Sequence, residues 1–426
     1  MLYLRAMSDQ VATTEPQPQS SLIGAFSIAV PACLKRQESR EVFRDFVFAG
    51  AALSVSILIA YLVTVDWQGT IPRDATSLAV GRDFLNFWMY GRAAVGPDPG
   101  RFYDILSYHQ ALRELLGMEM GGNWSYPPTA MLLAAPFGQL NYLTALTCWT
   151  VLGLGVFVVA TRNQVPDWRF LLPVLLSPAA LVCLASGQSS FLTAAMMVVI
   201  FAGLDRRPVM SGVLIGLLTI KPQLGLLFPF MLIASGRWRV FIAAAVTTLT
   251  LLALSIAAFG QDVWIDFVTK GLPVQGLVLA DPDRVATPGF PTIFMNLRGV
   301  DLSYTAAMSV QVLFSAVAIG AVIWAFRLRK CANPALLRAL FLACAIVVSP
   351  YILTYDLLPL TFAAVLLLAD TDLDGPGRRL VQLVFWTPTL QLVLGTLHVP
   401  GPALIAPVFI VYLLTRLRAE PTSVRT

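Results

Sequence analysis

Charged side chains are scarce in this chain, and histidine is almost absent. Only 12% of the 426 residues are Asp, Glu, Lys or Arg, whereas 57% are hydrophobic. Soluble domains carry about 25% charged residues, so this balance argues against a soluble domain. Two histidines are too few for a histidine-based metal centre. The five cysteines show no CxxC spacing, so the sequence predicts neither a disulfide framework nor a zinc site.

Several well-known catalytic and nucleotide-binding motifs are also missing. The chain contains no P-loop, no GxGxxG and no GxSxG sequence, so ATP-driven transport and serine hydrolysis lack sequence support. No cofactor and no metal is therefore expected. The net charge of +5 indicates asymmetry between membrane loops, and nucleic acid is not an expected partner.

What the chain does contain is a series of long apolar runs. Runs of roughly 15–22 residues separated by short polar breaks predict an all-α polytopic membrane protein. We expect about twelve transmembrane helices, with 11–13 as the range. The spans are expected near residues 47–65, 141–160, 169–186, 188–204, 208–220, 222–236, 239–259, 304–327, 335–350, 354–369, 380–397 and 402–416. The proline-interrupted segment 126–140 is expected to form a short or re-entrant helix.

The charges of the connections sort them into two sides of the membrane. Arg36, Arg40 and Arg44 precede the first span, and most short connections carry arginine, which places these parts in the cytoplasm. The long loops 66–126 and 261–303 are polar and aromatic and are expected outside. We expect three parts: a disordered, basic cytoplasmic segment at 1–44, a single transmembrane domain at 45–418 and a cytoplasmic tail at 419–426.

The segment 81–90, with the sequence GRDFLNFWMY, holds the first candidate for chemistry. It lies in the first outer loop, where residues 83–95 and 103–116 predict two interfacial helices. Acidic groups are costly near a membrane, so Asp83 among aromatic side chains is a candidate catalytic residue. The alternative is that aromatic side chains anchor the loop at the interface and Asp83 only caps a helix.

Other polar residues interrupt the later apolar runs. Gln188 opens one span, and Lys221 interrupts another beside Pro222. A lysine there is a candidate cation for a phosphate, or it snorkels to the interface. Asp356 enters a span and is either a site residue or a cap. The second outer loop carries Asp281, Asp283, Arg284, Asn296 and Arg298, and solvated loop charges are the alternative for each of them.

Several motifs, taken in order, resemble glycosyltransferase family 87. They are Arg82-Asp83-Phe84, Trp88, Gly91-Arg92-Ala93-Ala94, Tyr103-Asp104, Trp124-Ser125-Tyr126-Pro127-Pro128, Gly187-Gln188, Lys221-Pro222-Gln223, Ser349-Pro350 and Tyr355-Asp356-Leu357. The resemblance covers roughly residues 45–415. Family members are membrane enzymes of the GT-C fold that depend on polyprenyl-phosphate sugars, and they include α-1,2-mannosyltransferases. The resemblance therefore implies a hexosyltransferase of glycolipid or cell-envelope biosynthesis.

The resemblance also implies roles for individual residues. Asp83 matches the general base that accepts the proton of the acceptor hydroxyl in an inverting transfer. Lys221 is the first choice to stabilise the charge of the phosphate, followed by Arg298 and Arg284. The remaining substrate-binding candidates are Arg82, Trp88, Arg92, Trp124, Tyr126, Gln188, Gln223, Tyr351, Tyr355 and Asp356.

The implied partners are a polyprenyl-phosphate sugar donor, a lipid or glycan acceptor and membrane lipids. The implied location is the bacterial inner (plasma) membrane, with the N-terminus in the cytoplasm and the active site on the outer face. Mannose is the favoured sugar. Relatives often carry histidine where this chain has Tyr351, and tyrosine cannot act as a near-neutral acid.

Three alternatives stay open at this point. One is a pentosyl (arabinofuranosyl) transferase of the same fold. Another is a transporter or flippase of lipid-linked sugars, which predicts ionisable residues near the bilayer midplane and two related halves. The third is a non-catalytic membrane partner, in which Asp83 is only a helix cap.

Overall fold

The computed structural model describes residues 28–118, 122–124, 126–281, 288–329 and 332–420. All regular elements in these ranges are helices. These ranges also contain two isolated β-bridges, Asp66 with Arg73 and Arg73 with Ala79. The all-α polytopic class expected from the apolar runs is therefore confirmed. Residues 1–27 and 421–426, which include most of the predicted N-terminal segment and tail, lie outside the described ranges.

The predicted spans coincide with helices. Within the described ranges, six helical runs are long and apolar enough to cross a membrane, and the bent pair Trp168–Leu175 and Pro178–Ser186 would make a seventh. The six are α1 (Gln37–Thr64), α5 (Tyr142–Arg162), α12 (Trp238–Phe259), Asp262–Ala280, α17 (Tyr304–Leu328) and Gly401–Ala419. The total of twelve crossings stays a prediction.

Shorter helices supply the remaining predicted spans. They are α8 (Ser190–Gly203), α9 with η4 (Pro208–Leu217, Leu218–Ile220), α10 with α11 (Pro222–Gly225, Phe228–Ser235), α18 (Pro334–Val348), η6 with α19 (Thr354–Leu357, Leu358–Asp370) and α20 (Gly375–Thr396). Helices α18 and α19 are buried on nearly every side, so they form the centre of the bundle. Apolar residues cover their whole circumference, as expected for helices surrounded by other helices.

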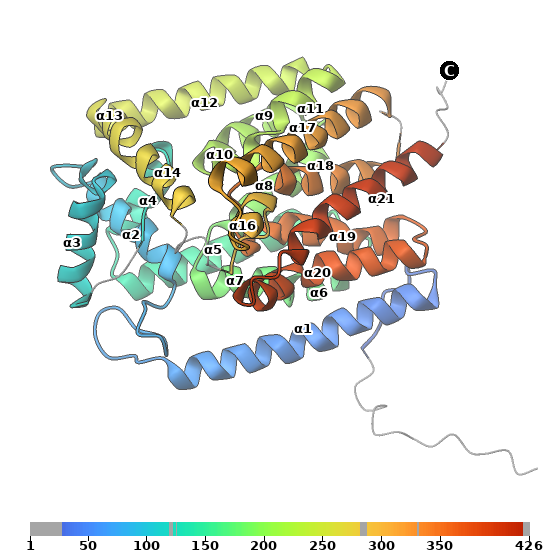
Figure 1. The fold of residues 1–426 in the computed structure, drawn as a ribbon, viewed down its shortest axis with the longest axis horizontal. Coiled ribbons are helices and arrows are strands. Elements are labelled where there is room, and N and C mark those ends of the chain that lie inside the picture. The colour runs from blue at the N-terminus through green and yellow to red at the C-terminus, as the bar shows by residue number, and fades with distance from the viewer. Residues whose placement is uncertain (1–27, 119–121, 125, 282–287, 330–331, 421–426) are drawn as a thin grey trace, which may run out of the picture.

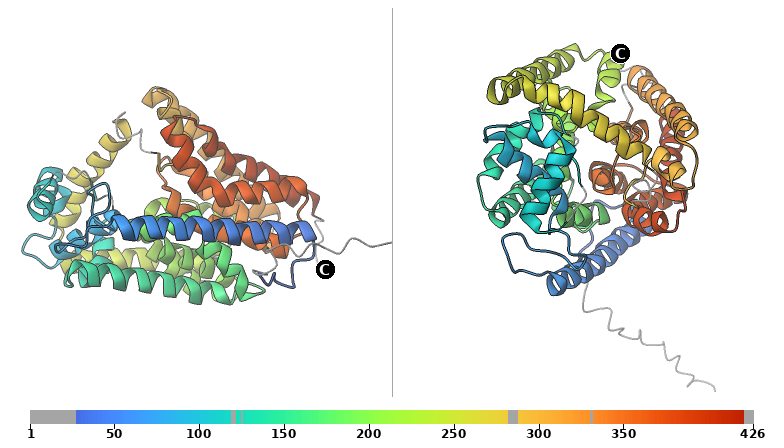
Figure 2. Two further views of the ribbon diagram at one scale, coloured as in Figure 1. Left: turned by 90° about the horizontal axis from the view of Figure 1, so that it is seen from below. Right: turned by 60° about the vertical axis from the view of Figure 1, so that its left-hand side comes forward.

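Helices that are not predicted spans gather at one end of the bundle. In Figure 1, α2 (Arg82–Ala94), α3 (Ile105–Leu116), α4 (Thr129–Gly138), α13 (Asp262–Asp266) and α14 (Leu272–Ala280) lie together at the left. The first helix, α1, runs along the bundle from the opposite end, and Figure 2 shows the same arrangement from two other sides. Arg36, just before α1, pairs with Asp372 at 2.8 Å at that opposite end.

The first outer loop folds largely as expected. It forms the two predicted helices, α2 and α3, and residues 126–140 form the short helix α4. Helices α2 and α4 touch through backbone at two glycines. A Cβ atom on Gly138 would lie 2.1 Å from the carbonyl carbon of Gly91, and one on Gly91 would lie 2.3 Å from the Ala134 oxygen. Only glycine permits this approach, which fixes α2 against α4.

The second outer loop differs from the expectation. Instead of an extended loop from residue 261, the chain forms α13, the π-helical turn η5 (Phe267–Gly271) and α14, and then α16 (Ile293–Arg298) after a gap. The continuous run 262–280 has a mean hydropathy of 1.2. This helix was not predicted from the sequence. Its charged residues lower the hydropathy of the run, and glycine and proline have low helix propensity.

Candidate active site

A cavity of about 620 Å³ opens between the helices gathered at one end of the molecule (α2, α3, α4, α13 and α14, the end cluster) and the rest of the bundle. Its walls come from α2, residues 122, 123 and 126, α10, α14 and residues between 349 and 355. Most of its polar lining consists of residues singled out from the sequence: Arg82, Asp83, Tyr126, Gln188, Lys221, Gln223, Tyr351 and Tyr355. The folded chain thus brings together segments that are up to about 270 residues apart in sequence.

Asp83 lies in the first turn of α2, and the chain before it is firmly held. Gly81 precedes the helix in a left-handed conformation, with φ of 71°. The Tyr142 hydroxyl donates to the backbone oxygens of Val80 and Gly81 at 2.5 and 3.1 Å. Arg82, which also lines the cavity, pairs with Asp74 at 2.6 Å. These contacts fix the start of α2 and therefore the position of Asp83.

The surroundings of Asp83 act on its pKa in two directions. Burial among protein atoms raises the pKa of this carboxyl above its ordinary value, because the charged form loses solvation. The Gln188 amide, the Lys221 ammonium and the Tyr355 hydroxyl lower it, whereas the Asp356 charge raises it further. The net direction is upward. A carboxylate with a raised pKa is a stronger base, which is what general-base catalysis near neutral pH requires.

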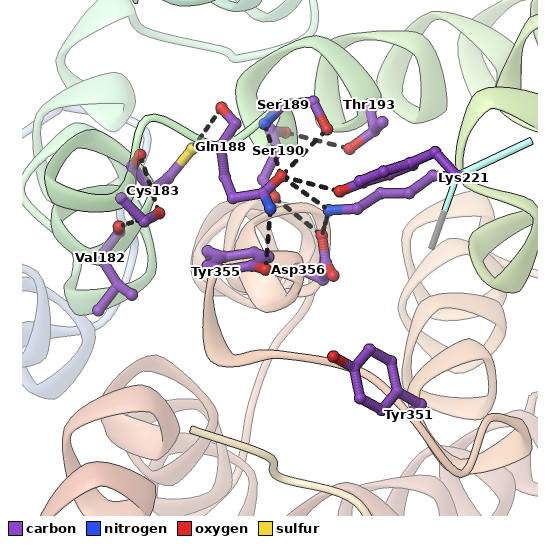
Figure 3. A network of polar contacts seen from close by, with 12 residues as sticks. Val182, Cys183, Gln188, Ser189, Ser190, Thr193, Lys221, Tyr351, Tyr355 and Asp356 are labelled. Atoms are coloured by element: carbon purple, nitrogen blue, oxygen red, sulfur yellow. Dashed lines mark hydrogen bonds and ion pairs between the residues drawn. The ribbon is translucent and has the colours of Figure 1, made fainter. Parts of the chain in front are cut away.

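Lys221, which lines the same cavity as Asp83, forms a buried ion pair with Asp356 (Figure 3). The Lys221 ammonium is 2.6 Å from the Asp356 Oδ1 atom, and the two side chains are 2% and 1% exposed. Ser190 donates its hydroxyl to the same carboxylate oxygen at 2.8 Å. The ammonium also lies 4.8 Å from the centre of the Tyr355 ring. The pair is neutral as a whole, so Lys221 does not present an unpaired charge to the cavity.

Gln188 joins this pair to the aromatic side chains. Its Oε1 atom accepts hydrogen bonds from the Tyr126 hydroxyl at 3.2 Å and from the Lys221 ammonium at 3.4 Å. Its Nε2 atom donates to the Tyr355 hydroxyl at 3.0 Å. Figure 3 shows Gln188 at the centre of these contacts, with the Tyr351 hydroxyl turned toward the same region.

Three breaks between helices place these side chains. Gln188 lies between α7 (Pro178–Ser186) and α8, Lys221 lies between η4 and α10, and Asp356 lies in η6 at the start of α19. At a break, backbone groups lose their helical partners, so polar residues and glycine or proline are favoured there. The Gly-Gln and Lys-Pro pairs in the sequence are the local signals of two of these breaks.

Two predicted site residues, Trp88 and Arg92, lie away from the cavity. They line a second, separate cavity of about 830 Å³ with residues 138–143. Trp88 donates its indole N–H to the Leu140 oxygen at 3.0 Å, and the Arg92 guanidinium stacks 4.8 Å over its ring. Trp88 and Arg92 lie five and nine residues after Asp83, which places them about 140° and 180° away from it around the helix. Trp88 and Arg92 therefore occupy the opposite face of α2 from Asp83, and their role in binding substrate stays a prediction.

Other predicted residues also fall outside the cavity lining. Trp124 is buried and stacks on Tyr90 with ring centres 4.4 Å apart. Arg298 uses its guanidinium to bind the backbone oxygens of Leu302 and Ala280 at 2.9 and 3.1 Å. It therefore ties α16 to the end of α14. Arg284 and Asp283 lie outside the described residues.

Three amide side chains in the cavity lining were missed from the sequence. Asn86 lies three residues after Asp83 on the same face of α2 and accepts a hydrogen bond from Tyr108. Asn123 donates to Gln275 of α14 at 3.2 Å, across the cavity opening. The spacing from Asp83 could have identified Asn86. The pairing of Asn123 with a residue 152 positions away has no local signal.

The described residues contain no group of three or more His, Cys, Asp or Glu side chains that could hold a metal ion. The acidic residues at 370–374 have structural partners. Asp372 pairs with Arg36, and Asp374 accepts from the Gly377 amide at the start of α20.

Comparison with known proteins gives one match. The model of glycosyltransferase family 87 matches residues 124–350. The matched part contains Tyr126, Gln188 and Lys221 of the cavity, whereas Tyr355 lies five residues after it and Asp83 lies 41 residues before it. No curated protein and no solved structure matches the chain.

Proposed function

The chain belongs to glycosyltransferase family 87, and from this premise we propose that it moves a sugar from a polyprenyl-phosphate donor to a lipid or glycan acceptor, with Asp83 as general base. The family makes the protein a membrane glycosyltransferase. The observation that carries the rest is the position of Asp83 in a cavity whose other polar side chains are mostly amides and tyrosines, with Arg82 and the neutralised Lys221 beside them.

The proposed reaction is a single displacement. The oxygen of an acceptor hydroxyl attacks the anomeric carbon, the bond from that carbon to the phosphate oxygen breaks, and the configuration inverts. Asp83 takes the hydroxyl proton, and polyprenyl phosphate leaves with the bonding electrons. A positioned carboxylate base typically contributes about 10²–10⁴-fold to such a step. Because a phosphate is a good leaving group, no strong general acid is needed.

The lining of the cavity suits a sugar. Amide side chains donate and accept hydrogen bonds at once, and five of them line the cavity together with three tyrosines: Asn86, Asn123, Gln188, Gln223, Gln275, Tyr126, Tyr351 and Tyr355. A neutral, polyhydroxylated ligand matches such a set better than an ion does. We propose mannose as the sugar, with Tyr351 as one of its contacts.

The apolar part of the lining suits a lipid donor. Leu226 and Leu272, from the two sides of the cavity, are 47% and 48% exposed. Exposed leucines on membrane helices face lipid, so a polyprenyl chain could lie against them while its phosphate reaches the polar end. Soluble nucleotide sugars would gain nothing from this apolar wall.

The proposed cation for the phosphate changes from Lys221 to Arg82. Turning Lys221 toward a phosphate would leave Asp356 buried and charged without its partner, which is strongly unfavourable. Arg82 lines the cavity next to Asp83, and its side chain is 46% exposed. Its partner Asp74 belongs to the loop before α2, and the Arg82 guanidinium has five N–H donors, so some of them can still bind a phosphate.

We further propose that the cavity faces the outside of the bacterial inner membrane and that the N-terminus is cytoplasmic. The helices α2, α3 and α4, which are too short to cross a membrane, lie at one end of the bundle, and α1 begins at the other end (Figure 1). Polar site residues near one end of the bundle also favour an enzyme over a transporter, for which charged residues near the midplane are expected.

The test uses the purified protein in lipid vesicles with an extract of membrane lipids as acceptor. Labelled polyprenyl-phosphate mannose, polyprenyl-phosphate arabinofuranose and a nucleotide mannose are offered separately. We expect a labelled product of inverted configuration from the first donor only. Transfer from the arabinofuranose donor would identify a pentosyltransferase. Movement of the donor across the vesicle membrane without transfer would contradict the proposal and indicate a flippase.

A further inference from the structure

We propose that the second cavity, which contains Trp88 and Arg92, binds an anionic phospholipid of the membrane, with Arg92 holding the phosphate of the headgroup. The proposal goes beyond sugar transfer and does not depend on it. Asp83 lines the first cavity, whereas Arg92 lines the second one from the opposite side of α2. A ligand of the second cavity is therefore separated from Asp83 by the width of a helix, about 10 Å.

Arg92 brings a positive charge to the wall of this cavity and has no anionic partner there. Its side chain is exposed near the end of α2. Its guanidinium lies 4.8 Å from the centre of the Trp88 ring, but no ion pair or hydrogen bond joins it to the residues that the structure describes. None of the described residues that line the cavity is Asp or Glu. An unpaired cation in a wall without carboxylates attracts an anion.

Trp88 holds this cation in a fixed place. The indole N–H donates to the Leu140 oxygen at 3.0 Å, and the Tyr142 ring packs edge-on against the indole with ring centres 5.4 Å apart. The link between α4 and α5 thus fixes the ring over which Arg92 lies. The N–H groups of a guanidinium lie in its own plane, so contact with a ring leaves them free to bind two oxygens of one phosphate.

Neutral polar side chains surround the cation and favour a headgroup with hydroxyl groups. Thr70, Gln139 and Asn141 line the cavity and are exposed. The Asn141 oxygen accepts from the Thr144 amide at 3.0 Å, which leaves its NH2 group for a ligand. An ethanolamine or choline headgroup would bring an ammonium group to a wall that offers it no carboxylate. A glycerol headgroup, which is anionic as a whole, fits this wall better.

The apolar part of the wall favours a lipid over a free phosphate. Val95, Leu140 and Leu143 line the cavity with exposed fractions of 56%, 39% and 38%. Leu143 lies in the first turn of α5, which is long and apolar enough to cross a membrane. The cavity therefore opens where α5 enters the lipid, and acyl chains can cover these side chains. An inorganic anion would use neither the apolar wall nor most of the 830 Å³.

The experiment uses phosphatidylglycerol with a photoreactive group near its headgroup, added to the purified protein in a neutral detergent. Arginine-rich connections elsewhere also attract anionic lipids, so labelling is read only from the peptide that contains residues 138–143. We expect labelling of this peptide to saturate in the wild-type protein. In Arg92→Gln the half-saturating concentration should rise by about 10- to 100-fold, because charge-assisted hydrogen bonds to the phosphate are lost.

Arg101→Gln is the matched control. Arg101 is also exposed and has no ion pair among the described residues, and its guanidinium also lies over an aromatic ring, 4.4 Å from the centre of Phe102. It does not line the cavity, so the half-saturating concentration should stay at the wild-type value. Arg92→Lys is a second variant that keeps the charge but loses the two-pronged contact. We expect it to weaken labelling less than Arg92→Gln does.

Unlabelled competitors identify the source of the phosphate. Phosphatidylglycerol should displace the photoreactive lipid, and phosphatidylethanolamine with the same acyl chains should do so less well. Displacement by inorganic phosphate or by polyprenyl phosphate as effective as that by phosphatidylglycerol would overturn the proposal. So would equal half-saturating concentrations in Arg92→Gln and the wild type, or an equal loss in Arg92→Gln and Arg101→Gln.

The outcomes for this site and for the proposed function are distinguishable. A protein that transfers no sugar, but shows labelling of residues 138–143 that depends on Arg92, would overturn the proposed function alone. A protein that transfers sugar, but whose labelling is the same in Arg92→Gln and the wild type, would overturn the phospholipid site alone.

Discussion

Removing one partner of the Lys221–Asp356 pair should destabilise the protein far more than removing both. The pair is 2.6 Å apart with side chains 2% and 1% exposed, so loss of either partner leaves an unpaired charge away from water. Breaking such a pair costs about 3–5 kcal/mol, whereas replacing both partners by apolar residues of similar volume is often neutral. Lys221→Met and Asp356→Leu should each be strongly destabilising, and the double variant should regain most of the loss.

The assay is a double-mutant cycle on thermal unfolding of the protein in detergent, followed by intrinsic fluorescence. Because unfolding of a membrane protein is rarely reversible, the four midpoints are compared at one heating rate. Asp372→Asn is the control, since the Arg36–Asp372 pair has a similar distance, 2.8 Å, but is 47% and 68% exposed. Exposed pairs contribute little, so this variant should melt close to the wild type.

Two results would refute the reasoning on this pair. If the single variants melted like the wild type, Lys221 and Asp356 would have to reach water or other partners. If the double variant lost as much as the two single variants together, the residues would act independently and the pair would not exist as a unit. In either case Lys221 would again be available for a phosphate.

Two further predictions concern the end cluster. Gly138→Ala should lower the yield and the melting temperature, because its Cβ would lie 2.1 Å from the Gly91 backbone and overpacking of this kind costs about 1–3 kcal/mol. Gly155→Ala is the control, since no atom lies within 4 Å of its Cβ position, and it should have little effect. Equal melting temperatures of the two variants would contradict the α2–α4 contact. Asp74→Ala should speed hydrogen exchange of the backbone amides at residues 74–82 but not in α17. The substitution removes the acceptor for the Thr76 amide at 2.9 Å and the partner of Arg82. Unchanged exchange in residues 74–82 would show that other contacts hold the loop.

Much of the fold could be predicted because it is set by local properties. Apolar runs long enough to cross a membrane become helices there, since no other structure satisfies the backbone in lipid. All twelve predicted spans coincide with helical segments, and the two helices of the first outer loop were also predicted. The run 262–280 was missed because its hydropathy of 1.2 is low and glycine and proline interrupt it.

The site was only partly predictable because its assembly is long-range. Gln188 and Lys221 were identified as polar interruptions of apolar runs, and Asp83 as an acidic residue among aromatic side chains, and both are local signals. The pairing of Lys221 with Asp356, 135 residues away, has no such signal, and it changes the role proposed for the lysine. The separation of Trp88 and Arg92 from Asp83 has a local signal, because the helical period alone places them on the far side of α2.

The central claim is that Asp83 is the base of a sugar transfer from a lipid phosphate. The most direct test is the single-turnover rate of transfer from labelled polyprenyl-phosphate mannose by Asp83→Asn, which keeps the shape of the side chain, measured beside the wild type at equal donor binding. We predict a loss of about 10²–10⁴-fold with an unchanged melting temperature. Transfer by Asp83→Asn at nearly the wild-type rate would contradict the account.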